Sequence, residues 1–163
     1  MRANKALFIA MHGKDASLSI TQIVEEEIAR NVIRCNGDNN KKELDKSKQG
    51  SWEWTYNSTG RNLVRMHWLC NFVKKILENL LTTEMTLVAA CQDAYTYGFG
   101  DHHGWLVRKG AGLAMMAAGQ KSAFIGRWGV NNIEEGRPAL DNLAVLCERL
   151  NHLLGSKNLL DLP

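Results

Sequence analysis

The sequence lacks the cysteine pairs, basic blocks and long apolar runs that mark several large classes of protein. Its four cysteines, Cys35, Cys70, Cys91 and Cys147, are widely spaced, and no CxxC or Cys/His zinc pattern occurs. They therefore predict reduced thiols in a cytoplasmic protein. No dense Lys/Arg block indicates nucleic-acid binding. The apolar run at residues 6–11 is too short to span a membrane.

Motifs for catalysis and for metal binding are missing as well. No serine lies in a GxSxG elbow, and the glycines at 110 and 112 lack the preceding strand that a phosphate loop requires. His102 and His103 are adjacent and point to different sides of a helix, and no histidine or glutamate four positions away completes a metal site. The sequence therefore predicts no enzyme, no cofactor and no metal.

The size of the chain favours a single globular domain, and its charge favours an anionic partner. The 163 residues are 45% hydrophobic, which is enough for a single globular domain with a sizeable core. The formal net charge of +3 is a mild basic excess. It suits an anionic membrane surface or an acidic ligand better than a nucleic-acid groove.

Helical periodicity runs through most of the chain, and no segment alternates convincingly as a strand, so the predicted fold class is all-α. The expected helices are 17–34, 59–80, 85–97, one that begins near 103, and 137–154. Asp15 is the predicted N-cap of the first helix, and Gly98 and Gly100 are predicted to end the third. Residues 36–57 are rich in Asn, Asp, Lys, Ser and Gly and predict a long polar loop.

Two arginines stand one turn apart at the start of helix 59–80. Arg61 and Arg65 are in line with its apolar stripe, so both are predicted on its buried side. With Thr59 as N-cap they fall in the first two turns, where the helix dipole favours negative charge. A bound phosphate would remove this conflict. Structural salt bridges to the glutamates at 25–27 explain the pair equally well.

A second constellation, Asp-His-His-Gly-Trp at 101–105, falls at a loop-to-helix junction. His103 there either reaches a ligand at the helix mouth or makes only a local hydrogen bond. Trp105 either faces a membrane or belongs to the core. The glycines at 110 and 112 in the next helix predict that another helix or a lipid chain approaches its backbone closely.

These residues together resemble the glycolipid transfer protein superfamily, most closely its ceramide-1-phosphate branch and, within that branch, the plant accelerated-cell-death type. The resemblance is carried by SITQIVEEEIARNVIRC, TGRNLVRMHWLCNFVKKILENL and AYTYGFGDHHGWLVRKGAGLAMMAAGQKSAF, and the closing GSKNLLDLP adds to it. The combination of RNLxR with HHGWxxRK is specific, whereas either motif alone is weak.

The resemblance implies a two-layer α-helical sandwich over residues 1–163 that encloses an apolar pocket. The implied function is a non-enzymatic cytoplasmic carrier that binds ceramide-1-phosphate-like sphingolipids and moves them between membranes. Arg61 and Arg65 then hold the lipid phosphate, His103 binds the ceramide amide carbonyl, and Trp105 lies near the surface that transiently contacts a membrane.

The chain also departs from the family pattern. The family's aspartate for the ceramide amide and hydroxyl groups has no match, which predicts an N-terminally shortened fold, and Asp15 is only a rival alignment for that position. A transfer-deficient lipid-sensing or regulatory scaffold with protein partners is therefore the competing hypothesis.

Overall fold

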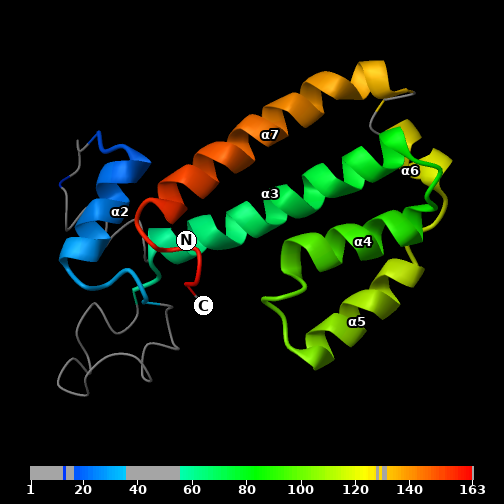
Figure 1. Ribbon diagram of the computed structural model, residues 1–163. Coiled ribbons are helices and arrows are strands. Elements are labelled where there is room, and N and C mark those ends of the chain that lie inside the picture. Colours follow the sequence, from blue (N-terminus) through cyan, green and yellow to red (C-terminus); the bar gives the residue numbers. More distant parts are fainter. Residues whose placement is uncertain (1–12, 14–16, 36–55, 128, 130–131, 163) are drawn as a thin grey trace. The chain divides into compact units, whose positions relative to one another are not determined.

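The computed structural model describes residues 13, 17–35, 56–127, 129 and 132–162. Within them the chain forms α2 (Ile20–Ala29), α3 (Thr59–Thr82), α4 (Leu87–Phe99), α5 (Trp105–Met116), α6 (Lys121–Arg127) and α7 (Ile133–Gly155) (Figure 1). These ranges contain no β-strand, and the all-α prediction is confirmed. No helix among them is both long and apolar enough to cross a membrane. The predicted loop lies outside the described residues except for Tyr56 and Asn57.

α2 is shorter than the predicted helix because both of its ends have local stop signals. Ser19 Oγ accepts a hydrogen bond from Gln22 N at 3.2 Å, and Gln22 Oε1 accepts one from Ser19 N at 2.8 Å, which makes a capping box. Asn31 has φ of 56°, a left-handed conformation that helix interiors exclude. The N-cap is therefore Ser19, and Asp15, the predicted cap, lies outside the described residues.

The chain divides into two compact units, Met1–Arg65 with Leu153–Pro163, and Met66–His152. In the first unit, Lys157 Nζ lies 2.7 Å from Glu25 Oε1, so an ion pair links the carboxy-terminal segment to α2. The buried apolar side chains of this unit are Val24, Val32, Ile33, Cys35, Tyr56, Leu63, Val64, Leu154, Leu159 and Leu162.

In the second unit, α3 lies between α4 and α7, and α5 lies beside α4 (Figure 1). Its core cluster comprises Ile76, Leu80, Leu87, Ala90, Cys91 and Ala94, with Phe72, Met115, Phe124 and Ile125 packed against them. On α7, Leu140, Cys147 and Leu150 are buried, at the spacing of one helix face. Thr86 caps α4 by accepting a hydrogen bond from Ala89 N at 3.2 Å.

The predicted apolar stripe of α3, positions 65, 69, 72, 73, 76, 77 and 80, is fully buried only at its last three positions. Ile76, Leu77 and Leu80 are buried, whereas Leu69 is 50% exposed and Arg65 lies at the surface. The prediction that Arg65 lies on the buried side is therefore wrong. Ile76 and Leu80 are buried because they pack against Leu87, Ala90, Cys91 and Ala94 of α4.

Gly98 lies where α4 comes closest to α3. A Cβ at this position would be 2.9 Å from both Phe72 Cβ and the Trp68 carbonyl oxygen. Because the Trp68 oxygen is backbone, it cannot move aside as a flexible side chain would. The prediction that Gly98 and Gly100 end this helix is confirmed for Gly100, which is the C-cap, and wrong for Gly98, which lies inside α4 and permits close helix packing.

The glycines of α5 behave differently. A Cβ on Gly110 or Gly112 would meet no atom of the described residues within 4 Å. The predicted close approach to this backbone is therefore absent from the part of the chain that the structure describes.

Adding a methyl group at Gly98 and at Gly110 should change stability in opposite directions. Gly98→Ala forces α4 away from α3 and should lower the free energy of unfolding by about 1 to 3 kcal/mol. Gly110→Ala, the matched control, should raise it by about 0.5 to 1 kcal/mol because alanine has less conformational freedom to lose. Urea unfolding followed by circular dichroism measures both, and equal stabilities for the two variants would contradict this packing.

Candidate functional site

A buried carboxylate lies at the amino-terminal end of α3. Glu27 Oε1 accepts hydrogen bonds from Tyr56 Oη and Thr59 N, both at 2.6 Å, and Glu27 Oε2 accepts one from Gly60 N at 2.9 Å. The Glu27 residue is only 1% exposed. The first amides of a helix favour a negative charge. The Glu27 carboxylate thus satisfies two of the first backbone amides of α3.

Ser58 rather than Thr59 is the residue that caps α3. Ser58 Oγ accepts a hydrogen bond from Arg61 N at 3.1 Å and donates one to the Ile33 carbonyl oxygen at 2.6 Å. Thr59 is the first helical residue, so the predicted cap is wrong by one position. Gly60 faces Ile33, whose side chain would have to shift to admit a Cβ at this position. The segment after α2 is therefore held tightly against the first turn of α3.

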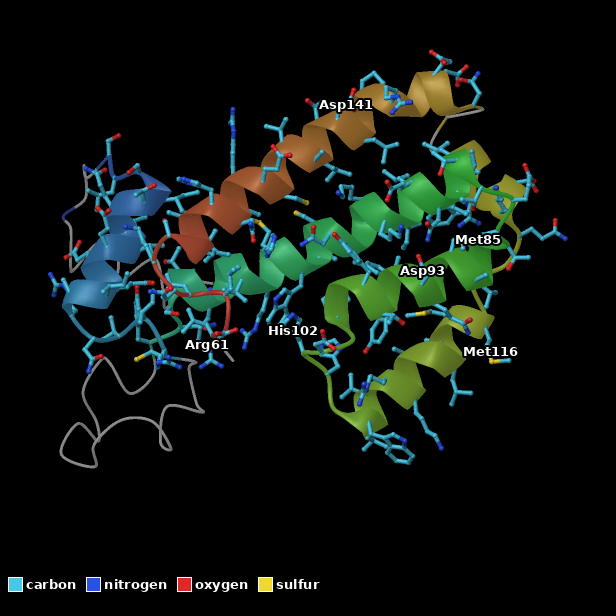
Figure 2. All side chains as sticks on the ribbon, in the orientation of Figure 1. Arg61, Met85, Asp93, His102, Met116 and Asp141 are labelled. Carbon is cyan, nitrogen blue, oxygen red and sulfur yellow. The ribbon has the colours of Figure 1, made fainter. Side chains whose placement is uncertain are left out.

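The two predicted phosphate-binding arginines have different environments. Arg61 is buried, and its Nη1 donates to the Arg34 carbonyl oxygen at 2.7 Å (Figure 2). Arg65, one turn later, is exposed. The bond to Arg34 fixes the orientation of the first guanidinium, whereas the second stands at the surface of α3.

His102 and His103 lie in the second unit and are each stacked on an aromatic ring. The His102 ring lies 3.8 Å from that of Trp68, centroid to centroid, at an interplanar angle of 10° (Figure 2). The His103 ring lies 5.2 Å from that of Phe99 at 7°, and its Nδ1 is 2.6 Å from Tyr95 Oη. The predicted local hydrogen bond of His103 is therefore present. Tyr95 is not among the residues predicted for the site.

α5 presents an apolar face to solvent. Trp105 is 63% exposed, which excludes the core alternative for this residue within the described structure. Leu106, Leu113 and Met116 are also exposed, and no residue of α5 is buried. The Lys109 ammonium lies 4.4 Å from the centroid of the Trp105 ring, within the range of a cation–π contact. Contiguous exposed apolar side chains are typical of a surface that binds a partner or a membrane.

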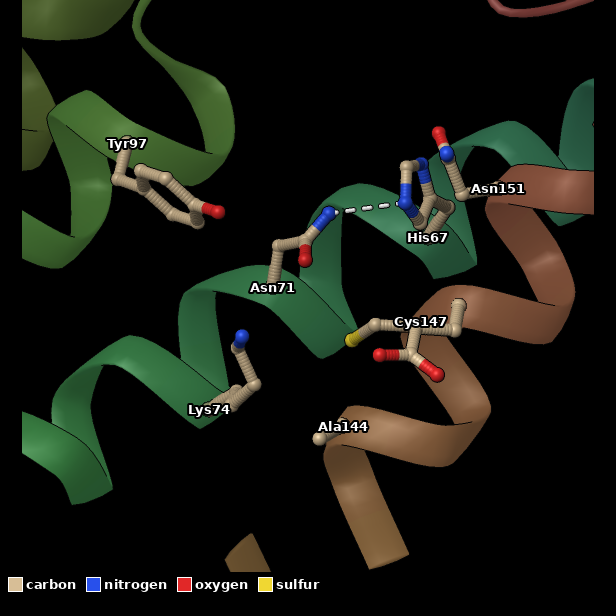
Figure 3. Close-up of a pocket in the computed structure, with 8 residues that line it drawn as sticks. His67, Asn71, Lys74, Tyr97, Ala144, Cys147 and Asn151 are labelled. Carbon is tan, nitrogen blue, oxygen red and sulfur yellow. Dashed lines mark hydrogen bonds between the residues drawn. The ribbon is translucent and has the colours of Figure 1, made fainter. Parts of the chain in front are cut away.

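A cleft of about 350 Å³ opens in the second unit between α3, α4 and α7 (Figure 3). It is lined by His67, Asn71, Lys74, Tyr97, Ala144, Cys147, Glu148 and Asn151. Asn71 Nδ2 and His67 Nε2 are 3.0 Å apart. Burial lowers the pKa of His67, and the nearby His102 lowers it further, so the neutral ring is favoured. Among the lining residues, Lys74 carries a positive charge and Glu148 a negative one. None of the site residues predicted from the sequence lines this cleft.

Comparisons with known proteins agree with the architecture. The family described as glycolipid transfer protein matches residues 9–130. The ceramide-1-phosphate transfer protein of Danio rerio is 28% identical over 129 residues, which are 74% of this chain and 58% of that protein. The chain thus spans less than two thirds of that relative.

Two solved structures share the fold. Human ceramide-1-phosphate transfer protein in complex with 12:0 ceramide-1-phosphate is 19% identical, with a TM-score of 0.74 over 99% of this chain and 74% of that chain. A mutant of Arabidopsis accelerated-cell-death 11 complexed with C12 ceramide-1-phosphate is 18% identical, with a TM-score of 0.64 over 97% of this chain and 70% of that chain.

Replacing the Glu27 carboxylate should destabilise the fold strongly. Glu27→Gln keeps the size of the side chain but places an amide NH2 among three donors, so the free energy of unfolding should fall by about 2 to 4 kcal/mol. Glu25→Gln is the control because its ion pair with Lys157 is exposed and worth at most about 1 kcal/mol. Equal losses for the two variants in chemical unfolding would show that the buried contacts of Glu27 contribute nothing special.

The phenol of Tyr56 should make stability depend on pH in alkaline solution. Burial raises its pKa above the ordinary value near 10, and the hydrogen bond to Glu27 raises it further. The folded chain therefore holds this proton more tightly than the unfolded chain. The contribution of the protonated phenol to the free energy of unfolding is complete below pH 10 and is lost as the pH rises beyond it. In urea titrations from about pH 8 to 11, wild type should lose stability more steeply than Tyr56→Phe. Parallel curves would refute this role.

Proposed function

Since the chain belongs to the glycolipid transfer protein family, we propose that it is a non-enzymatic carrier that binds ceramide-1-phosphate-like sphingolipids and transfers them between membranes. The observation that carries the proposal is the pair Arg61 and Arg65, two guanidinium groups one turn apart at the start of α3. Relatives named for ceramide-1-phosphate transfer support the same headgroup. In this proposal the carrier is cytoplasmic and contacts membranes transiently.

Arg61 and Arg65 hold the lipid phosphate with complementary roles. Arg61 is oriented in advance by its bond to the Arg34 carbonyl, and exposed Arg65 meets the incoming headgroup. Guanidinium forks bind phosphate in a bidentate manner. Because Glu27 accepts the bonds of Thr59 N and Gly60 N, side chains rather than those two amides bind the phosphate.

His103 and Trp105 complete the proposed roles. His103 hydrogen-bonds the ceramide amide carbonyl, which satisfies a polar group that would otherwise be buried without a partner. Trp105 inserts into the membrane interface together with the exposed apolar side chains of α5, Leu106, Leu113 and Met116. Lys109 beside the Trp105 ring adds attraction to anionic lipid.

Transfer of fluorescent ceramide-1-phosphate between phosphatidylcholine vesicles tests the phosphate assignment. Arg65→Ala removes one fork and should lower the transfer rate at least ~10-fold, since a charge-assisted contact is worth about 1.5 to 3 kcal/mol. Arg149→Ala, an exposed arginine on α7, is the matched control and should change the rate less than ~2-fold. Arg65→Ala with the rate of wild type would refute the phosphate role.

Native mass spectrometry of protein isolated from cells separates this carrier from a regulatory scaffold of the same fold. A co-purified sphingolipid supports the carrier. Protein without lipid but with a stably bound protein partner supports the scaffold.

A further inference from the structure

Two residues of α4 hold the ring of His103. Tyr95 and Phe99 are one helical turn apart, and their ring centroids are 5.7 Å apart. Tyr95 Oη lies 2.6 Å from His103 Nδ1, which is a short hydrogen bond. The Phe99 ring is nearly parallel to the imidazole at an interplanar angle of 7°. The imidazole is therefore fixed at one edge by the phenol and on one face by the phenyl ring.

The backbone around His103 is fixed as well. His102 N and His103 N both donate to the Phe99 carbonyl oxygen, at 3.0 and 3.1 Å. Phe99 itself packs against Phe72 of α3, with ring centroids 5.4 Å apart. The stack of His102 on Trp68 anchors the same turn to α3. Neither the main chain nor the ring of His103 is thus free to rotate away from Tyr95.

The bond to Tyr95 has a consequence for the other ring nitrogen. A neutral imidazole carries its proton on one nitrogen and accepts at the other. A phenol is a better donor than acceptor, because its oxygen lone pair is delocalised into the ring, and the unprotonated imidazole nitrogen is a strong acceptor. With Tyr95 donating to Nδ1, the proton lies on Nε2, and this nitrogen becomes a donor.

We propose that Tyr95 is a positioning residue that sets His103 in the Nε2–H tautomer, so that Nε2 donates to the carbonyl oxygen of the lipid amide. The inference rests on the proposed function and deepens it. A carbonyl oxygen only accepts hydrogen bonds, so the opposite tautomer would bring two acceptors face to face. Tyr95 thereby selects ligands that carry a carbonyl at this position.

NMR spectroscopy of the lipid-free protein tests the tautomer directly. Long-range ¹H–¹⁵N correlation at neutral to mildly alkaline pH distinguishes a protonated Nε2 from a protonated Nδ1, and His103→Asn assigns the signals. Wild type should show His103 protonated at Nε2. In Tyr95→Phe, the Nδ1 resonance should shift because it no longer accepts the phenol hydrogen bond.

Binding to phosphatidylcholine vesicles that contain a minority of ceramide-1-phosphate tests the link to the ligand. Tyr95→Phe should weaken ceramide-1-phosphate uptake about 2- to 10-fold, the value of one ordinary hydrogen bond. Tyr97→Phe is the matched control on the same helix. Tyr97 lines the cleft of Figure 3 and is 59% exposed, so its loss should leave uptake unchanged.

The two measurements separate failure of this inference from failure of the carrier function. The role of Tyr95 is overturned if His103 of the wild type is protonated at Nδ1, or if Tyr95→Phe takes up ceramide-1-phosphate as the wild type does. Neither result contradicts the carrier function. A wild-type protein that takes up no ceramide-1-phosphate overturns the carrier function and the proposed bond from His103 Nε2 to the lipid carbonyl. The NMR measurement then still decides whether Tyr95 sets the tautomer of His103.

Discussion

The buried carboxylate of Glu27 is the contact on which the start of α3 depends. It joins α2 to Tyr56, Thr59 and Gly60, which follow Glu27 in the chain by 29, 32 and 33 positions. A carboxylate is costly to remove from water, and three donors offset that cost only in this one arrangement. The contact therefore fixes where α3 begins, and with it the position of Arg61 on the first turn.

Most of the helical architecture could be predicted from the sequence because amphipathic periodicity is a local property. The inward faces of α4 and α7 follow directly from residues such as Leu87 and Leu150. The ends of helices were harder to predict, because a glycine can end a helix, as Gly100 does, or permit close packing inside one, as Gly98 does. α6 was missed, since its seven residues are too few to establish a period.

The candidate site was predictable as a set of residue types but not as a set of contacts. The spacing of Arg61 and Arg65 is visible in the sequence, but their different burial is not, because Arg61 is held against the Arg34 carbonyl oxygen and Arg65 is exposed. The partner of the helix end, Glu27, was only one of three neighbouring glutamates in the sequence. The pairing of Tyr95 with His103 spans eight positions across a turn, and no periodic pattern indicates it.

The absence of buried residues in α5 bears on its dynamics. Because α5 has no buried residue and Met115 is its side chain packed against the core cluster, little apolar burial is lost when its own hydrogen bonds open, and its opening free energy is expected to lie below that of the core. The backbone amides of α5 are therefore the ones that exchange with solvent deuterium soonest among the long helices described. α5 can therefore change its conformation at a surface while α3 and α4 keep their packing.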